Sequence, residues 1–354
     1  MKKVVLRYEK EGFPTTAVRE VRALRRLSHP NVVMLLDVWA APSGPGSSGP
    51  GDAYLIFEYS PHDLTGLISY RKRMKPPEIK CLIRQLADAL DFCHMQNFMH
   101  RDLKPSNILI TGKGDLKLCD FGLSRDFEGP GNYSTRVITL WYRPPELLLG
   151  ARHYDARVDV WSAGCIFGEL LSGYALFPDS TEIQVFRKIC ARTGAQAPEN
   201  WPEEVRRLPN WEKFFAPPGT RGAPPAAEKN FFADLRAKYG AVCVDLLKKT
   251  LHLDPTLRIT SDAVVSHEFF DQEPLACQPH EIKMPAPHMS CHELGVKKRR
   301  EERDKELKEQ QAALSQAPQS QGLLANVQGP GSKRPGGGAP GALPQPSPKR
   351  ARPP

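Results

Sequence analysis

The sequence lacks any long apolar run. No stretch of roughly eighteen apolar residues occurs, and even the segment from Ala163 to Leu171 is interrupted by Glu169, which excludes a transmembrane helix. The chain starts with only three consecutive apolar residues, Val4 to Leu6, before the charged Arg7, whereas the core of a secretory signal needs roughly 7–15. These absences predict a cytosolic or nuclear protein that does not engage a membrane.

Paired cysteines are also missing. The eight cysteines form no Cys-x-x-Cys motif, and most lie inside apolar stretches, as small buried thiols do. One cluster of possible zinc ligands consists of His280, His288, Cys291 and His292. Its spacing matches no standard zinc finger. The sequence therefore predicts no metal site at this cluster.

The first 290 residues have little excess of positive over negative charge. They contain 37 Lys and Arg against 34 Asp and Glu, whereas residues 291–354 contain twelve against six, out of a net charge of +9. A nucleic-acid surface on the folded body is therefore not expected. The tail begins with Lys297 to Arg300 and turns into Gly, Pro, Gln and Ser, a composition typical of disorder. Its basic clusters are either nuclear-import signals and polyanion contacts or merely solubilising charge.

Apolar periodicity predicts sheet first and helix later. A helix capped by Thr15 or Thr16 carries Val18, Val21 and Leu24 on one face. Residues 41–51 form a Gly/Pro/Ser insertion, and residues 157–270 read as helical with an interruption at 216–226. The remaining predicted elements are strands at Val4–Leu6, Val32–Trp39, Tyr54–Tyr59, Ile108–Ile110 and Leu116–Leu118, and a helix from Pro76 to about Asn97.

Three ordered motifs carry the chemistry. His100-Arg101-Asp102-Leu103-Lys104-Pro105-Ser106-Asn107 is followed by Asp120-Phe121-Gly122 and then by Pro144-Pro145-Glu146. Phosphoryl transfer from ATP needs a carboxylate that orients the attacking hydroxyl, oxygen ligands for Mg²⁺ and cations on the phosphates. Asp102 suits the first role, Asn107 and Asp120 suit the second, and Lys104 can reach the transferred phosphate. The order and spacing of the motifs make this set very specific.

With these motifs the chain resembles the cyclin-dependent protein kinases. Pro14-Thr15-Thr16-Ala17-Val18-Arg19-Glu20 is similar to their cyclin-binding helix, and Thr139 to Arg143 and Asp159 to Ile166 also match. Glu9-Lys10-Glu11-Gly12-Phe13-Pro14 and Cys291-His292-Glu293-Leu294 narrow the resemblance to the transcription-elongation branch, whose members phosphorylate the C-terminal repeats of RNA polymerase II. The resemblance covers about residues 1–300.

The resemblance implies an α+β fold with two lobes and a nucleotide between them. It divides the chain into a shortened N-lobe and hinge at 1–62, a C-lobe at 63–270, a C-terminal extension at 271–296 and a disordered tail at 297–354. Lys2, with Lys3 as the less favoured alternative, would anchor the ATP phosphates and pair with Glu20. The other implied ATP-site residues are Phe57, the backbones of Glu58 and Ser60, Asp63 and Leu109.

The resemblance also implies a control site. Thr139 joins Asp102 and Lys104 in the catalytic set. Arg19, Arg101 and Arg125 would converge on a phosphorylated Ser134, with Thr135 as the neighbouring alternative; otherwise they are three separate surface charges. Glu146 and Arg258 would form a buried, structural ion pair.

One family feature is missing from this sequence. No Gly-x-Gly-x-x-Gly precedes Lys2, because Met1 stands directly before it, so we expect an N-terminally truncated chain with an open sheet edge and weak nucleotide affinity. Two hypotheses follow. The first is a nuclear, cyclin-activated kinase that uses ATP and Mg²⁺ at Ser-Pro or Thr-Pro sites; the second is a non-catalytic protein that binds a cyclin through the Pro14–Leu27 helix.

Overall fold

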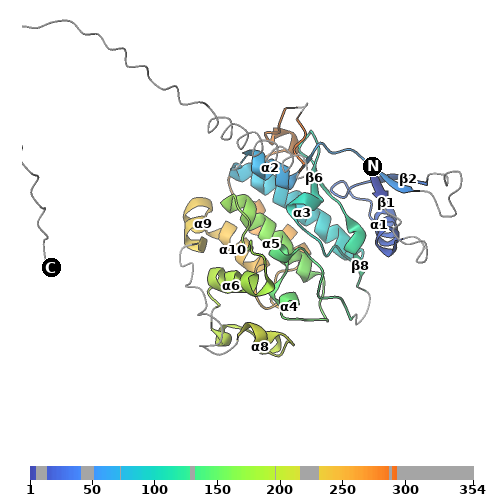
Figure 1. Ribbon diagram of the computed structural model, residues 1–354. Helices are drawn as coiled ribbons and strands as arrows, with labels where there is room; N and C mark the ends of the chain where they lie inside the picture. The colour runs from blue at the N-terminus through green and yellow to red at the C-terminus, as the bar shows by residue number, and fades with distance from the viewer. Residues whose placement is uncertain are drawn as a thin grey trace, which may run out of the picture. The chain divides into compact units, whose positions relative to one another are not determined.

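The computed structural model describes eight stretches of the chain: residues 1–4, 14–40, 52–71, 73–127, 132–195, 197–215, 231–286 and 289–292. All of them belong to one compact unit, Met1–Arg303 (Figure 1). The insertion predicted at 41–51, the interruption at 216–226 and the tail from 297 lie outside the described residues, as do Val5 and Leu6 of the first predicted strand.

A small antiparallel sheet and one helix form the first lobe. Strands β1 (Lys2–Val4), β3 (Ala53–Phe57) and β2 (Leu35–Ala40) pair in that spatial order, with Lys2 opposite Leu55. Helix α1 (Thr15–Arg26) packs on the sheet, and its Ala17 joins the buried Val4, Ala53 and Leu55 in a small core. These elements lie together in Figure 1.

Two predictions for this lobe are wrong in detail. Neither threonine caps α1, because Pro14 occupies the N-cap and its carbonyl accepts the amides of Ala17 and Val18. The strand predicted at Val32–Trp39 begins only at Leu35. The residues before it pair elsewhere, since Val33 donates its amide to the carbonyl of Leu118 at 2.9 Å.

Helices dominate the second lobe. Helix α3 (Pro76–Met95) agrees with the predicted helix to within two residues, and β6 (Ile108–Ile110) and β7 (Leu116–Leu118) have the predicted bounds. The sheet order there is β4-β6-β7. The remaining elements are β4 (His62–Asp63), α2 (Leu64–Arg71), β5 (Phe98–Met99), β8 (Arg125–Asp126), α4 (Pro145–Leu148), α5 (Arg157–Ser172), α6 (Glu182–Thr193), α7 (Glu203–Arg206), α8 (Trp211–Phe214), α9 (Phe231–Tyr239), α10 (Ala241–Thr250) and α11 (Ser261–Val265).

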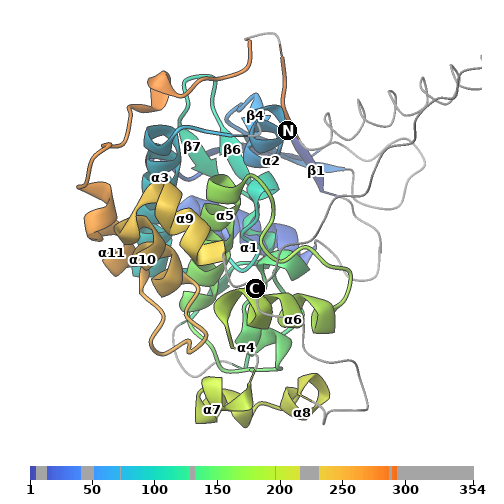
Figure 2. The same ribbon diagram turned by 90° about the vertical axis from the view of Figure 1, so that its left-hand side faces the viewer.

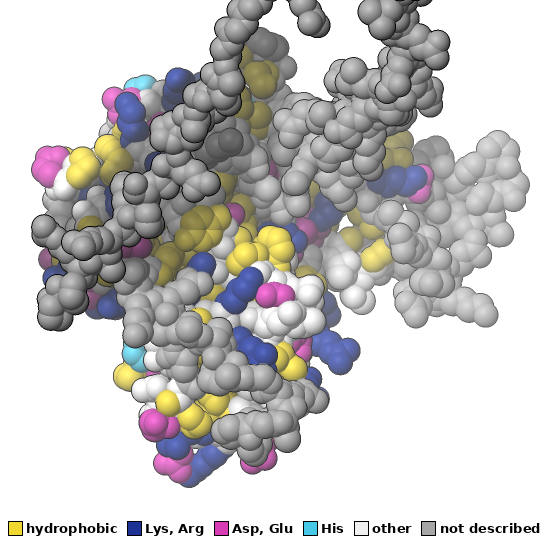
Figure 3. Space-filling view, turned by 60° about the vertical axis from the view of Figure 1, so that its left-hand side comes forward, with side chains coloured by type: hydrophobic (Ala, Val, Ile, Leu, Met, Phe, Trp, Pro, Cys, Tyr) yellow, Lys and Arg dark blue, Asp and Glu magenta, His cyan; other side chains and the backbone are white. Residues whose placement is uncertain are grey.

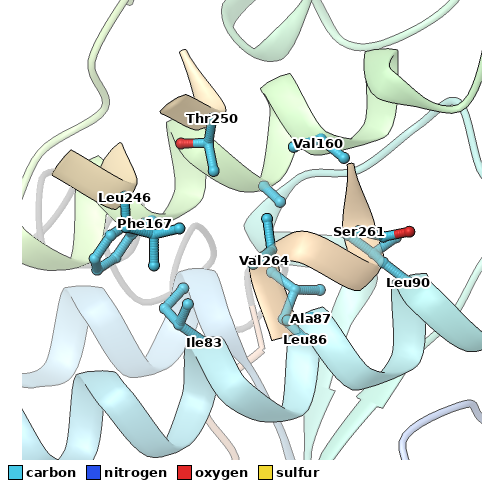
Figure 4. Close-up of a pocket in the computed structure, with 11 residues that line it drawn as sticks. Ile83, Leu86, Ala87, Leu90, Val160, Phe167, Leu246, Thr250, Ser261 and Val264 are labelled. Atoms are coloured by element: carbon cyan, nitrogen blue, oxygen red, sulfur yellow. The ribbon is translucent and has the colours of Figure 1, made fainter. Parts of the chain in front are cut away.

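The core of this lobe lies where α3, α5, α10 and α11 meet (Figure 2). Figure 4 shows apolar side chains from all four helices pointing into a common space, among them Leu86, Phe167, Leu246 and Val264. The cavity between them measures about 20 Å³, room for roughly one water molecule. No predicted site residue lines it, so we regard it as a packing gap.

The fold class is confirmed as a sheet-containing lobe followed by a helical lobe. Within the described stretches, no helix is long and apolar enough to cross a membrane, and no group of three or more His, Cys, Asp and Glu side chains is placed to hold a metal ion; His288 of the zinc candidate is not described. On the face shown in Figure 3, Lys and Arg side chains are interspersed with acidic and apolar ones.

Candidate functional site

Lys2 connects the two lobes through two carboxylates. Its Nζ lies 2.8 Å from Oε2 of Glu20 on α1 and 2.9 Å from Oδ1 of Asp120, which follows β7. Burial disfavours the charged forms, but the pairing outweighs it at Lys2, whose pKa is raised, and at Asp120, whose pKa is lowered. At the more deeply buried Glu20 burial prevails and raises the pKa. Lys3 instead pairs with the exposed Asp52 at 2.7 Å. The structure thus brings Lys2, rather than its neighbour, to the predicted site.

The backbone around Asp120 is specialised. Asp120 has a left-handed φ of 64°, a conformation that Asp tolerates better than most residues. The next side chain, Phe121, is fully buried, and its ring meets that of His100 edge-on at 4.9 Å. The buried phenylalanine therefore fixes the segment from which the Asp120 carboxylate reaches Lys2.

Asp102 is surrounded by hydrogen-bond donors. Its Oδ2 accepts from Nζ of Lys104 and Nδ2 of Asn107, both at 3.0 Å. Its Oδ1 accepts from the hydroxyl of Thr139 at 2.9 Å and from the amide of Thr139 at 3.2 Å. Three predicted residues therefore give four donors to the carboxylate of the fourth, Asp102, and fix its orientation.

Asp159, to which the sequence assigned no role, holds the backbone of His100 and Arg101 just before Asp102. Asp159 on α5 is completely buried, and its two oxygens accept the amides of His100 and Arg101, each at 2.8 Å. Burial opposes its charge, but hydrogen bonding from His94 at 3.1 Å contributes to a lowered pKa for Asp159. Arg101 has a φ of 63°, a strained backbone that these bonds stabilise. Its place inside the Asp159–Ile166 motif was the available signal.

The predicted adenine edge lies at the junction of the lobes. Phe57 ends β3, and the carboxylate of Glu58 pairs with Lys117 at 3.0 Å. Ser60 and Asp63 are buried, and Leu109 in β6 stands opposite Asp63. The segment that joins β3 to β4 therefore runs beside β6, which carries Leu109.

The C-terminal extension covers part of this junction, which the sequence analysis did not foresee. The amide of Asp63 donates to the carbonyl of Cys291 at 3.1 Å, and Nε2 of His292 lies 3.0 Å from the carbonyl of Ser60. The hydrogen bond to Asp63 raises the pKa of His292. The contact depends on Gly66, because a Cβ there would lie 1.9 Å from the carbonyl oxygen of Cys291.

Three predicted arginines lie near one another. Burial and then the positive charges of Arg125 and Arg101 lower the pKa of Arg19. Nη1 of Arg101 donates to the Tyr154 hydroxyl at 3.2 Å, and that hydroxyl donates to the carbonyl of the exposed Ser134 at 2.8 Å. The structure therefore links Ser134 to the arginine group through one tyrosine.

The backbone carbonyl of Ile138, next to the Thr139 that contacts Asp102, is already occupied. Ile138 has a φ of 65°, rare for a β-branched residue. Its carbonyl accepts from Nη2 and Nε of Arg143, at 3.0 and 3.2 Å. Arg143 is fixed in turn by Glu182 at 2.8 Å. This carbonyl is consequently engaged by a side chain of the protein itself.

The remaining predicted pair is internal. Arg258 and Glu146 meet through two parallel bonds of 2.7 and 2.9 Å, and both side chains are almost fully buried. Their position in the core of the helical lobe fits a structural role.

Comparisons with known proteins agree with this geometry. A family model described as "Protein kinase domain" matches residues 1–270. The chain is 39% identical over 341 residues to "Cyclin-dependent kinase C-1" of Oryza sativa subsp. japonica, which covers 93% of this chain and 63% of the relative. It is 38% identical over 289 residues to human "Cyclin-dependent kinase 9", which covers 80% of this chain and 75% of that protein.

A solved structure is similar as well. The chain superimposes on a chain of the yeast RNA Pol II CTD kinase CTDK-1 complex with a TM-score of 0.67 and 34% sequence identity, over 79% of this chain and 87% of the other. The chain described here spans just under two thirds of the length of the rice relative.

Proposed function

Because the chain belongs to the protein kinase domain family and, within it, to the cyclin-dependent kinases of the transcription-elongation branch, we propose that it transfers the γ-phosphate of ATP to serine or threonine residues that precede proline. The observation that carries the proposal is the set of donors around Asp102. They hold the carboxylate in one orientation, from which it would accept the proton of a substrate hydroxyl. Lys104 lies beside it to stabilise the transferred phosphate.

The donor set fits a nucleotide with Mg²⁺. Asn107 uses its amide nitrogen on Asp102, so that, among the described hydrogen bonds, its carboxamide oxygen accepts none and can serve as a hard ligand. Asp120 is kept ionised by Lys2. We assign Asn107 and Asp120 to the metal, which would neutralise phosphate charge, and Lys2 to the phosphates.

The adenine would occupy the edge formed by Phe57, the backbones of Glu58 and Ser60, and Leu109, with Asp63 toward the ribose. His292 at the carbonyl of Ser60 borders the same edge. The alternative, a protein that binds a cyclin without turnover, is less favoured, because it gives no reason for the four-donor arrangement at Asp102 or for the placement of Lys2 between two carboxylates.

A cyclin is the proposed partner, bound on α1. Half of the Val18 side chain is exposed on this helix, and Met34 and Leu36 before and within β2 are more than half exposed. Apolar side chains left in solvent on one lobe favour a protein partner. Because Glu20 lies on α1, a cyclin bound to this helix would control whether Glu20 reaches Lys2.

The substrate and the site of action follow from the family. We propose the C-terminal repeats of RNA polymerase II as substrate and the nucleus as the location, and no direct contact of the folded body with nucleic acid. We propose that residues 1–62 and 63–270 form the two lobes, residues 271–296 the C-terminal extension and residues 297–354 the tail.

Proline selectivity tests this proposal. Since Arg143 occupies the Ile138 carbonyl, an amide N–H after the phosphoacceptor finds no partner there, whereas proline has no N–H to satisfy. An unsatisfied donor costs about 1–3 kcal/mol, so a Ser-Pro peptide should exceed its Ser-Ala twin roughly 5- to 150-fold in kcat/KM, measured with the cyclin-bound chain.

Arg143→Ala should narrow that ratio by freeing the carbonyl. The matched control is Lys188→Ala, which removes a positively charged side chain that pairs with Asp179 on the same lobe. It should leave the Ser-Pro to Ser-Ala ratio of kcat/KM unchanged. Equal rates on the two peptides with the wild-type enzyme would refute proline direction.

Phosphorylation at Ser134 is expected to switch the enzyme on. A phosphate there can bridge Arg19, Arg101 and Arg125, whose mutual repulsion it relieves. Each charge-assisted hydrogen bond contributes about 1.5–3 kcal/mol, so Ser134→Ala should lower the activity of the cyclin-bound enzyme at least about tenfold. Thr135→Ala, measured beside it, should have little effect. A loss confined to Thr135→Ala would move the phosphosite by one residue.

A further inference from the structure

Two cysteines far apart in the sequence lie together beside the C-terminal extension. Cys81 stands in the second turn of α3, and Cys277 precedes the short turn at Pro279–Glu281. The amide of Cys277 donates to the carbonyl of Pro77 at 3.3 Å. In α3 that same carbonyl is the acceptor for the amide of Cys81, four residues later. The two cysteines thus share one backbone acceptor, and their side chains lie close enough for each to shift the pKa of the other.

We propose that Cys81 and Cys277 form a reversible disulfide that ties the C-terminal extension to α3. Both are free thiols in this structure. Cys277 is only partly buried, whereas the Cys81 side chain is 4% exposed. A peroxide therefore reaches Cys277 first, and Cys81 is already in place to resolve the product.

The reaction balances with hydrogen peroxide as oxidant. The thiolate of Cys277 attacks one peroxide oxygen, the O–O bond breaks, and the products are a sulfenic acid and water. The thiolate of Cys81 then attacks the sulfenyl sulfur, the S–O bond breaks, and a second water leaves with the remaining proton. Two thiols lose two electrons in total, and a thiol reductant reverses the step.

The surroundings of the two cysteines make their oxidation slow. Burial raises the pKa of Cys81 to about 12, and burial likewise raises the pKa of Cys277, with the carboxylates of Glu78, Glu281 and Asp115 adding to these shifts. Little thiolate is present at neutral pH, so the pair responds to sustained rather than brief oxidation.

The disulfide would strengthen an attachment that is otherwise non-covalent. The extension is held on the first turns of α3 by polar contacts: Nζ of Lys80 donates to the carbonyl of Gln272, and the amide of Lys283 donates to Glu78 at 3.0 Å. The same segment continues to Cys291, whose carbonyl accepts the Asp63 amide at the junction of the lobes. A covalent link at Cys277 keeps this stretch close to its docking position.

The test uses the full chain treated with hydrogen peroxide and digested without reductant. Mass spectrometry should find a peptide pair joined through Cys81 and Cys277 that disappears with dithiothreitol. Cys277→Ser and Cys81→Ala should each abolish it. Cys243→Ser, which removes another buried thiol of the same lobe, should leave it intact. If Cys277 is oxidised without this link, or links to a different cysteine in the folded chain, the proposal is overturned.

A second measurement addresses the docking. Hydrogen exchange at the Asp63 amide should slow at least several-fold on oxidation of the wild-type chain and stay unchanged on the same treatment of Cys277→Ser. Identical exchange in the oxidised and reduced wild-type chain, with the link formed, would overturn the claim that the disulfide secures the extension.

Discussion

Replacing Asp102 by Asn is expected to lower phosphoryl transfer by roughly 10²–10⁴-fold, the range that a positioned general base contributes. Both carboxylate oxygens accept two donors each, from Lys104, Asn107 and the amide and hydroxyl of Thr139. In either orientation, the side-chain NH₂ of the introduced asparagine would face hydrogen-bond donors. The variant therefore loses both the proton acceptor and the hydrogen bonds that orient it. The measurement is kcat with a Ser-Pro peptide, ATP and the bound cyclin.

Asp88→Asn is the matched control for this change. It also turns one carboxylate into an amide, but Asp88 is partly exposed on α3 and its ion pair, with Arg84 at 3.6 Å, contributes about 0.3–0.5 kcal/mol. Its activity should equal that of the wild type, and both variants should bind the cyclin normally. Turnover by Asp102→Asn close to the wild-type rate would refute the assignment of the base.

Glu146→Gln is expected to destabilise the folded chain by about 3–5 kcal/mol, because it leaves the buried guanidinium of Arg258 without its counter-charge. Arg258 is 1% exposed and packs over the ring of Trp161 at 5.1 Å, so solvent cannot replace the lost partner. The drop in melting temperature should be of the order of 10 °C, measured by thermal unfolding.

Glu203→Gln provides the contrast. Its pair with Arg207 is largely exposed on α7, and exposed pairs contribute about 0–1 kcal/mol. Replacing both buried partners, as Glu146→Leu with Arg258→Met, should recover part of the lost stability, because no unpaired charge remains. A loss below about 1 kcal/mol for Glu146→Gln alone would contradict the buried-pair argument.

The residues that the sequence predicted best are those that act within short motifs. Asp102, Lys104 and Asn107 are close in the chain, so their grouping follows from local geometry. The two lobes could likewise be predicted from apolar periodicity. The helix cap could not, because the choice between Pro14 and Thr15 depends on the backbone direction at which the chain enters α1.

What escaped prediction depends on distant partners. Asp159 stands 59 positions after His100 and Cys291 stands 229 positions after His62. Both residues lie in motifs that the sequence shows, but the motifs do not reveal which distant group each residue contacts. The predicted strand began too early, at Val32 instead of Leu35, for the same reason, because the Val33 amide bonds to the carbonyl of the distant Leu118. Tertiary pairing overrode local propensity at each of these positions.

The burial of Asp159 has a consequence for synthesis of the chain. When the segment up to Thr139 has emerged from a ribosome, every motif residue of the proposed active site already exists, but the carboxylate that receives the His100 and Arg101 amides does not. The left-handed backbone of Arg101 lacks its Asp159 partner until α5 is made and packed. A nascent chain therefore carries these motif residues before it carries the carboxylate that fixes their loop, so we expect phosphoryl transfer to require the packing of α5.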